Sequence, residues 1–195
     1  MKKRLILVTS PPACGKTYIS KMLAKNIKNI VYLDKDTLIP LSHVIFDVAG
    51  QERNRSSDFF EKYIRNPEYE VVVNLAMEAL EDADTVLINA PFTREVRNPA
   101  YVRELKKKLA EHNARLTVVW VETTLDVCRQ RMIARNSPRD TWKLANWDEY
   151  VSTRDYSIPE GIDDPEIPDD FLVFKNSSTA EYEESMARIL KILAE

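Results

Sequence analysis

The sequence is poor in the residues that build several common kinds of site. Its two cysteines are too few for a disulfide framework and lack the paired spacing of a zinc site. Its two histidines are isolated, without a metal-ligand partner at helical spacing. No apolar run is long enough to span a bilayer, and 28 Lys and Arg face 31 Asp and Glu. We therefore expect no membrane protein and no duplex-binding surface, and we expect a reducing, cytoplasmic location.

What is present is typical of a single α/β domain, expected to span residues 1–195, since a chain of this length buries roughly 70% of its unfolded surface. Short apolar runs predict five buried strands at 5–8, 30–33, 85–88, 116–121 and 171–174. Helical patterns occupy 16–25, 38–46, 57–63, 68–80, 100–111, 125–135, 139–154 and 181–193, and the acidic stretch 157–170 predicts an exposed loop. Strands that alternate with helices predict a largely parallel sheet covered on both faces.

Glycine is scarce, with three in the chain, and one of them lies where the first strand meets a helix. Residues 9–17 read Thr-Ser-Pro-Pro-Ala-Cys-Gly-Lys-Thr and resemble a nucleotide-binding P-loop. In such a loop, backbone N–H groups and a helix N-terminus bind phosphate oxygens, Lys16 bridges the outer phosphates, and Thr17 supplies a hydroxyl to Mg²⁺. The nucleotide-binding residues predicted here are Ser10, Pro12, Ala13, Cys14, Gly15, Lys16 and Thr17.

The loop departs from the usual pattern near its start. Ser10 replaces the first glycine, and the two prolines that follow have no N–H to donate. The cradle must then come from residues 13–17. Because Cys14 lies inside it, next to a helix N-terminus, we expect a lowered thiol pKa and a reactive thiol. The alternative interpretation is an ordinary strand-to-helix turn.

Two carboxylates follow the second predicted strand. In an extended chain Asp34 and Asp36 point to the same side, at the sheet edge where open α/β sheets bind ligands. This pair suggests phosphoryl transfer, with one carboxylate holding Mg²⁺ and the next orienting or deprotonating an acceptor hydroxyl. Alternatively, one of the two caps a helix that starts near Thr37.

The end of the third strand lacks the acid that many P-loop proteins have there. Asn89 occupies the position, which makes Asp34 more important as a metal partner. In the turn that follows, Arg94 is predicted to hold an anionic or hydroxylated acceptor, the alternative being a solvated loop arginine.

Arginines are concentrated after the fourth strand. Arg131 and Arg135 are four residues apart and share a helix face, and Arg139 lies just past a predicted break at Asn136. A lid-like segment at about 129–155 can close over the transferring phosphate and neutralise its charge. A solvated basic face is the alternative, and Trp142 is expected in a packing face of the helix that follows.

Taken in order, the P-loop, the Asp-x-Asp strand end, the Asn89 turn and the Arg131/Arg135 pair resemble the small P-loop kinases of the polynucleotide kinase, zeta toxin and chloramphenicol phosphotransferase group. The resemblance implies a three-layer P-loop NTPase fold with strand order 2-3-1-4-5 and the use of ATP and Mg²⁺. It also implies that Asp36 activates the acceptor, that Asp34 is the Mg²⁺ partner, and that Asn176 belongs to the base-binding loop.

The expected function is therefore Mg²⁺-dependent transfer of the γ-phosphoryl group of ATP to a small-molecule hydroxyl. The expected catalytic residues are Lys16, Asp36, Arg131 and Arg135. Polynucleotide kinases carry an arginine where Ile39 stands and an aspartate where Asn89 stands. Both departures weaken the reading as a 5′-hydroxyl nucleic-acid kinase, which is kept as one alternative. A nucleotide-binding regulatory module is the other. The acceptor and the oligomeric state stay open.

Overall fold

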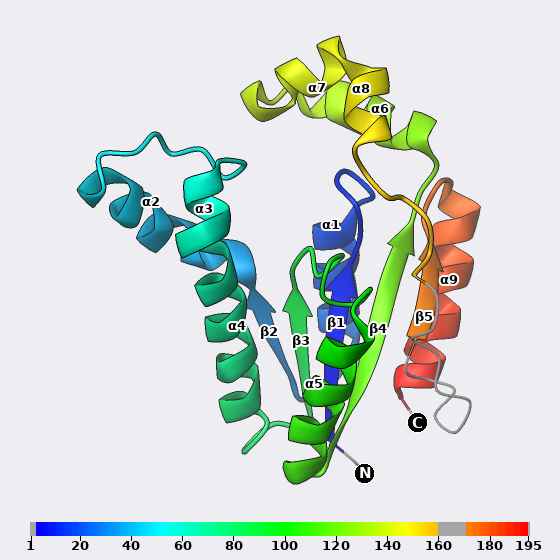
Figure 1. Ribbon diagram of the computed structural model, residues 1–195. Helices are drawn as coiled ribbons and strands as arrows, with labels where there is room; N and C mark the ends of the chain where they lie inside the picture. Colours follow the sequence, from blue (N-terminus) through cyan, green and yellow to red (C-terminus); the bar gives the residue numbers. More distant parts are fainter. Residues whose placement is uncertain (1–2, 160–170, 195) are drawn as a thin grey trace.

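The computed structural model describes residues 3–159 and 171–194, except for the side chain of Arg139. Five parallel strands form one sheet in the order β2-β3-β1-β4-β5 (Figure 1). Their bounds are Lys3–Thr9 for β1, Ile30–Asp34 for β2, Thr85–Asn89 for β3, Ala114–Glu122 for β4 and Phe171–Lys175 for β5. All five strands, their parallel pairing and the strand order are confirmed. Of the loop predicted at 157–170, residues 160–170 lie outside the described part of the chain.

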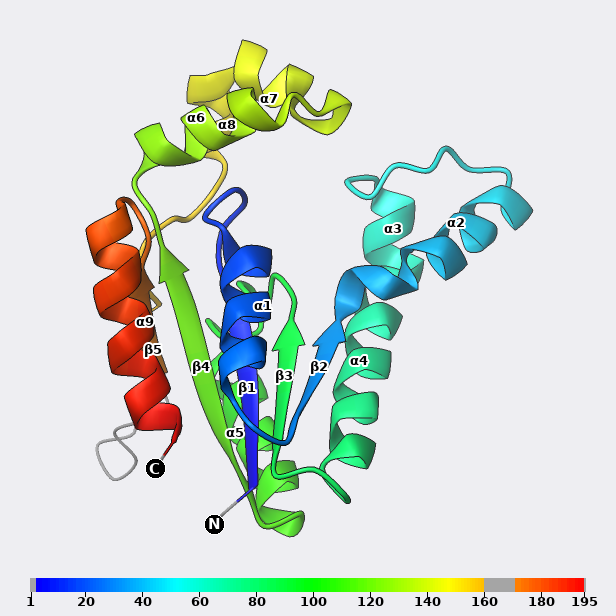
Figure 2. The ribbon, with the colours of Figure 1, turned by 180° about the vertical axis from the view of Figure 1, so that it is seen from behind.

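Helices cover both faces of the sheet. Helices α4 (Arg65–Ala79) and α5 (Pro99–Glu111) lie on one face, and α1 (Lys16–Asn26) and α9 (Thr179–Leu193) lie on the other (Figures 1 and 2). Helix α5 buries Val102, Leu105 and Leu109, whose spacing of three and four residues puts them on one side. The apolar side chains of β1 alternate between the two resulting cores. Within the described residues, no helix is long and apolar enough to cross a membrane.

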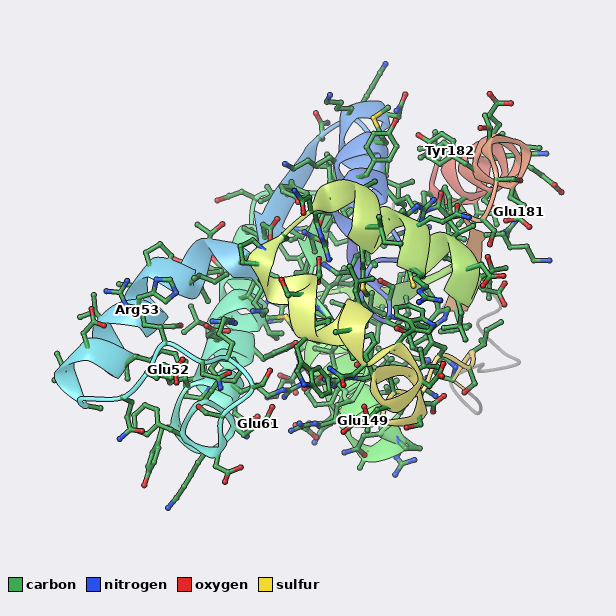
Figure 3. All side chains as sticks on the ribbon, turned by 90° about the horizontal axis from the view of Figure 1, so that it is seen from above. Glu52, Arg53, Glu61, Glu149, Glu181 and Tyr182 are labelled. Atoms are coloured by element: carbon green, nitrogen blue, oxygen red, sulfur yellow. The ribbon has the colours of Figure 1, made fainter. Side chains whose placement is uncertain are left out.

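Two groups of short helices extend beyond the carboxyl end of the strands. The arm consists of η1 (Lys35–Leu38), α2 (Ile39–Val48) and α3 (Asp58–Tyr63). The lid consists of α6 (Leu125–Arg135), η2 (Pro138–Asp140), α7 (Thr141–Ala145) and α8 (Trp147–Ser152). Figure 3 looks down on this end and shows the arm, with Glu52, Arg53 and Glu61, on one side and Glu181 and Tyr182 of α9 on the other. Both termini lie at the opposite end (Figure 1).

The lid differs from the single helix predicted at 139–154. The break at Asn136 is confirmed, because this residue ends α6 in a left-handed conformation with φ of 46°. A second break follows at Asn146, with φ of −123° and ψ of 49°. Its side chain and its backbone N–H both donate to the carbonyl of Trp142, which closes α7 after five residues. The expected packing face is wrong at Trp142, which is 56% exposed.

Candidate functional site

The loop between β1 and α1 forms a cradle at the carboxyl edge of the sheet. Two of its residues have left-handed backbone conformations, Ala13 with φ of 67° and Gly15 with φ of 93°. A β-carbon on Gly15 would lie 2.5 Å from Nδ2 of Asn176, so the position requires glycine. No side chain of the described residues caps α1. Its first N–H groups are therefore available to an anionic ligand.

A pocket of about 420 Å³ opens above this loop. It brings together nine of the predicted site residues, namely Ser10, Pro12, Ala13, Gly15, Lys16, Thr17, Asp36, Arg131 and Arg135. Tyr18, Pro91 and Lys143 line it as well and were not predicted. Four predicted site residues do not line this pocket: Asp34, Cys14, Arg94 and Asn176. Asn176 lines a neighbouring pocket, and Arg94 lines a third one, toward the arm.

Asn89, at the end of β3, connects the loop lysine to the carboxylate of Asp34. Its Oδ1 accepts hydrogen bonds from Nζ of Lys16 at 2.6 Å and from Oγ of Ser20 at 3.3 Å. Its Nδ2 donates to Oδ2 of Asp34 at 2.8 Å and to Oγ1 of Thr17 at 3.4 Å. An amide can accept from an ammonium and donate to a carboxylate at once, whereas an ionised aspartate at this position could only accept. The sequence pattern indicates Asn89 only as a missing acid, because its bridging position depends on side chains far along the chain.

Lys16 is held in a buried, polar setting. Burial lowers its pKa to about 8, although the charges of Asp36 and Asp34 act in the opposite direction. Its ammonium has one close neutral partner, the amide oxygen of Asn89. The arrangement therefore suits a ligand that brings negative charge to Lys16.

Asp34 and Asp36 do not share a strand face, so that prediction is wrong. Strand β2 ends at Asp34, and the chain turns at once into the 3₁₀ helix η1. The capping alternative is confirmed for Asp34, whose Oδ1 accepts a hydrogen bond from the N–H of Asp36 at 3.0 Å. The side chain of Asp36 is 60% exposed and lines the pocket, with Oδ1 lying 3.3 Å from Nζ of Lys35.

The residues around Asn89 fit Mg²⁺ bound together with a nucleotide. In the described part of the chain, no group of three or more His, Cys, Asp or Glu side chains could hold a metal ion. Mg²⁺ in nucleotide sites needs one or two protein oxygens, because phosphates and waters supply the others. Asn89 brings the oxygens of Thr17 and Asp34 together. The hydroxyl of Tyr32 and the backbone N–H of Asp36 also donate hydrogen bonds to the carboxylate of Asp34. Because these bonds occupy both oxygens, Asp34 is suited to contact the ion through a water molecule.

Three side chains from distant segments hold the underside of the loop. The carbonyl of Cys14 accepts hydrogen bonds from Oγ1 of Thr123 at 3.0 Å, from NH1 of Arg131 at 3.0 Å and from Nδ2 of Asn176 at 2.7 Å. Arg131 also donates to the carbonyl of Asn176 at 2.8 Å. The guanidinium of Arg131 thus shapes the loop, in addition to lining the pocket.

The thiol of Cys14 contradicts the expected reactivity. It points away from the pocket into the core beneath the loop, and the residue is 1% exposed. A hydrogen bond with Cys128 and burial raise the pKa of the Cys14 thiol, so the prediction of a lowered pKa is wrong. Burial and the hydrogen bond with Cys128 therefore outweigh any effect of the nearby helix N-terminus on this thiol.

The lid presents two cations that share one buried carboxylate. NH2 of Arg135 lies 2.6 Å from Oδ2 of Asp140, and Nζ of Lys143 lies 3.1 Å from Oδ1. Asp140 has no exposed side-chain surface, whereas the side chains of Arg135 and Lys143 are 35% and 26% exposed. Lys143 was missed from the sequence, although its spacing of three residues from Asp140 is the detectable signal.

A second pocket, of about 530 Å³, lies between the loop, the arm and the lid. Asp36 and Lys143 line both pockets, so the two spaces are continuous at these side chains. The other walls of this pocket include the rings of Phe60, Tyr69 and Tyr150. We call this space the cleft.

Arg94 lines the cleft, and its contact with an acceptor stays a prediction. Its guanidinium is 2.8 Å from Oε2 of Glu61 on α3, and its side chain is 61% exposed. Arg97, from the same turn, pairs with Asp155 at 2.9 Å. Both arginines thus connect the cleft wall to neighbouring segments.

Glu68 links the arm to helix α4. Its carboxylate accepts hydrogen bonds from Nζ of Lys35 at 2.9 Å, from both terminal nitrogens of Arg55 at 2.6 Å, and from Oγ of Ser42. Burial raises the pKa of Glu68, but the bonds from Arg55, Ser42 and Lys35 outweigh it and bring the pKa to about 2. No local signal in the sequence distinguishes Arg55 from a surface arginine.

Asn176 lines a neighbouring pocket of about 510 Å³, which shares Gly15, Tyr18 and Arg131 with the pocket above the loop. Gly15, Arg131 and Tyr182 also line it, and the rings of Tyr18 and Tyr182 lie 5.8 Å apart between centroids. This pocket adjoins the phosphate loop through Gly15. The role of Asn176 in base binding stays a prediction.

Solved structures share this fold. A protein described as a candidate kinase from Chloroflexus aurantiacus J-10-fl superposes with a TM-score of 0.63 at 18% identity, covering 100% of this chain and 98% of its own. A gluconokinase from Sinorhizobium meliloti 1021 gives a TM-score of 0.53 at 13% identity, with 99% and 96% covered. A shikimate kinase from Bacteroides thetaiotaomicron gives 0.52 at 16% identity, with 99% and 99% covered. At these identities the likeness establishes the fold.

A search among curated proteins found no match to the chain. A family model described as "AAA domain" matches residues 5–155, which include the P-loop, the arm and the lid. This match covers more than half of the sequence, and with the shared fold it confirms the resemblance drawn from the motifs. The chain belongs to the AAA domain family.

Proposed function

We propose that the chain is a kinase that transfers the γ-phosphoryl group of ATP to a hydroxyl group of a small molecule. One observation carries the proposal: Lys16, Asp36 and Arg135 line a single pocket. These three supply a phosphate-binding cation, a carboxylate for an acceptor hydroxyl and a cation for developing charge. The kinases among the solved structures of the same fold support this reading.

The loop and Lys16 bind the phosphates in this proposal. The N–H groups at the start of α1 face the β-phosphate, and Lys16 exchanges its bond to Asn89 for phosphate oxygens. Thr17 and Asp34 hold Mg²⁺, which when bound neutralises charge on the outer phosphates. Arg131 keeps the loop in shape through the carbonyl of Cys14.

Asp36 is the residue that handles the acceptor. Its exposed carboxylate lies where the phosphate pocket meets the cleft. It accepts the proton of the acceptor hydroxyl while the new oxygen–phosphorus bond forms and the bond to ADP breaks. Arg135 and Lys143 of the lid stabilise the negative charge of the transferring group.

The dimensions and walls of the cleft favour a small acceptor. A pocket of about 530 Å³ lies within the usual range for small-molecule sites. Its aromatic residues, Phe60, Tyr69 and Tyr150, are at most 7% exposed, and cationic side chains lie over their rings. The net charge of −3 offers no general attraction for nucleic acid.

The test is a panel of hydroxyl compounds, including an oligonucleotide with a free 5′ end, incubated with γ-labelled ATP and the full chain. Asp36→Asn should keep ATP affinity and lower phosphoryl transfer by roughly 10²- to 10⁴-fold, the usual range for loss of a general base. Asp82→Asn is the matched control, because this exposed aspartate lies in the turn between α4 and β3, away from the pocket.

Three results would contradict the proposal. Transfer at the wild-type rate by the Asp36→Asn protein removes the central residue of the mechanism. Labelling of the oligonucleotide alone favours the nucleic-acid kinase. ATP binding without transfer to any acceptor, with Asp36→Asn changing only affinity, favours a nucleotide-binding regulatory module.

A further inference from the structure

The two cysteines of the chain meet beneath the phosphate loop. Sγ of Cys14, in the loop, lies 3.6 Å from Sγ of Cys128, in α6. The residues are 114 positions apart in sequence and are 1% and 0% exposed. Both thiols are free. Since the kinase mechanism uses neither sulfur, their contact calls for a separate explanation.

The surroundings of the pair make one thiol easier to ionise. The two thiols share a hydrogen bond, for which either sulfur can be the donor. This bond, together with the nearby charge of Arg131, lowers the pKa of Cys128, although burial opposes it. The same bond and burial raise the pKa of Cys14. A thiol with a lowered pKa beside a second cysteine is one feature of cysteine pairs that oxidise reversibly, and access to oxidant is the other. Because both residues are buried, peroxide reaches them only when the loop moves.

We propose that Cys14 and Cys128 are a reversible oxidation site, at which hydrogen peroxide converts the two thiols to a disulfide that weakens nucleotide binding. The second half of this proposal rests on the proposed function, because it assumes that the loop binds ATP. In a reducing compartment such a disulfide forms transiently and reports oxidant.

The reaction proceeds in two balanced steps. The Cys128 thiolate attacks one oxygen of the peroxide, the oxygen–oxygen bond breaks, and the products are a sulfenic acid on Cys128 and, after protonation, water. The Cys14 sulfur then attacks the sulfenic sulfur, displacing hydroxide, which takes up the Cys14 proton and leaves as a second water. Two thiols and one peroxide give one disulfide and two waters, and the sulfurs supply both electrons.

The disulfide requires movement, and the loop is the part that moves. A disulfide bond is about 2.0 Å long, so the two sulfurs must approach by roughly 1.6 Å. Cys128 is fixed within the hydrogen-bonded turns of α6, whereas Cys14 lies in a loop between two left-handed residues, Ala13 and Gly15. Moving Cys14 displaces its carbonyl from Arg131 and Asn176 and changes the direction of the adjacent N–H groups.

Oxidation and nucleotide binding should therefore oppose each other. If the disulfide lowers the affinity for nucleotide, bound nucleotide must disfavour the disulfide by the same factor. A tenfold loss of ATP affinity is a reasonable expectation, because coupled sites usually differ by roughly 5- to 150-fold.

The experiment treats the reduced, full-length protein with hydrogen peroxide. We expect the number of free thiols in denaturant to fall from two to none, without dimers on a non-reducing gel, and a mapped peptide that joins residues 14 and 128. Calorimetric titration should show a roughly tenfold higher Kd for ATP after oxidation. Dithiothreitol should restore both the thiols and the affinity, and saturating Mg-ATP should slow the oxidation.

Cys128→Ser and Cys128→Ala serve as the controls, since this residue contacts neither pocket and two substitutions guard against a packing defect in one of them. Both should bind ATP like the reduced wild type and should be insensitive to peroxide. Added oxygen atoms without a crosslink, or dimers, would overturn the disulfide. A crosslinked protein with unchanged ATP affinity would overturn its effect on the nucleotide. A reduced protein that binds no ATP, yet forms the crosslink, would refute the proposed function and that effect while leaving the disulfide established.

Discussion

The position of Gly15 requires glycine for two separate reasons: the backbone is left-handed, and there is no room for a side chain. Its φ is 93°, and an added β-carbon would approach Nδ2 of Asn176 to 2.5 Å. Gly15→Ala should lower the free energy of unfolding by about 1–3 kcal/mol, the usual strain of such a conformation, and should also weaken nucleotide binding. Gly50→Ala separates the two effects, because Gly50 has φ of 63° with nothing within 4 Å of the added carbon.

The Gly50→Ala protein should also lose free energy of unfolding through backbone strain, but its nucleotide affinity should be unchanged. Thermal unfolding and calorimetric ATP titration of both variants measure this. Equal affinity losses in the two variants would mean that backbone strain anywhere in the chain acts on the site.

The lowered pKa of Lys16 predicts how nucleotide binding depends on pH. Its pKa in the free protein is lowered to about 8, below the value of 10.5 for an ordinary lysine. Above pH 8 the free protein loses this proton, while a bound phosphate favours the charged form. The Kd for ATP should therefore rise with pH above about 8, by at most tenfold per pH unit. Titrations from pH 7 to pH 10 check this.

Lys16→Met is the comparison, because it removes the titrating group. Its Kd should be higher than that of the wild type at pH 7 and should change little between pH 7 and pH 10. A wild-type Kd that stays flat over this range would contradict the assignment of Lys16 to the phosphates.

Sequence reasoning at this scale identified residue types better than their partners. Lys16 and Asp36 could be placed in one pocket because a loop motif and a strand end fix the backbone nearby. The bridging position of Asn89 and the burial of the Cys14 thiol depend on side chains far along the chain, at Asp34 and Cys128. Such contacts have no local pattern.

At the scale of elements, Glu68 determines whether the arm stays in place. It joins α4 to η1, to α2 and to the segment before α3. Glu68→Ala should lower the free energy of unfolding by about 3–5 kcal/mol, because it removes the buried partner of Lys35 and leaves this buried ammonium only the exposed carboxylate of Asp36. Glu78→Ala, at an exposed position of the same helix, should have an effect within about 0.5 kcal/mol. Urea denaturation of both variants measures the difference.

The sign of the accompanying pH effect follows from the lowered pKa of Glu68. A carboxyl group with a folded-state pKa of about 2 stabilises the fold at pH values above its ordinary pKa of 4.5. This contribution disappears as the pH falls from about 4.5 to about 2. The wild type should therefore lose more stability over this interval than Glu68→Ala does. Parallel losses in the two proteins would contradict this.

Elements marked by an apolar run or a helical hydrophobic pattern could be predicted from the sequence. Element ends that depend on a single side-chain contact could not. The five strands are continuous apolar runs, so their positions follow from the sequence. The region 139–154 has a helical pattern, yet Asn146 breaks it by bonding back to Trp142. One side chain thus decides between one helix and two.

At the scale of the whole molecule, alternation of strands and helices predicts the layers, and the carboxyl edge of the sheet predicts where ligands bind. The cleft could not be predicted in this way, because its shape depends on the positions of the arm and the lid relative to the sheet. Two ion pairs at the cleft, Glu68 with Arg55 and Arg97 with Asp155, each join segments from different parts of the chain.

Nucleotide should stabilise the molecule as a whole. Mg-ATP at about 100 times its Kd adds roughly 2.7 kcal/mol to the free energy of unfolding, which corresponds to a rise in Tm of about 5–10 °C for a domain of this size. Lys16→Ala should show a much smaller rise at the same concentration. An equal rise in the variant would indicate that ATP binds elsewhere on the protein.

The central place of β1 has a consequence for synthesis of the chain. Its neighbours in the sheet are β3, which begins at Thr85, and β4, which begins at Ala114. At ~5–20 residues per second, a ribosome needs roughly 5–20 s to complete these partners. During that time the apolar residues of β1 have no strand to pair with, so we expect the nascent chain to be a ligand for chaperones that bind apolar segments. Asn176 emerges later still, and the underside of the phosphate loop is completed only then.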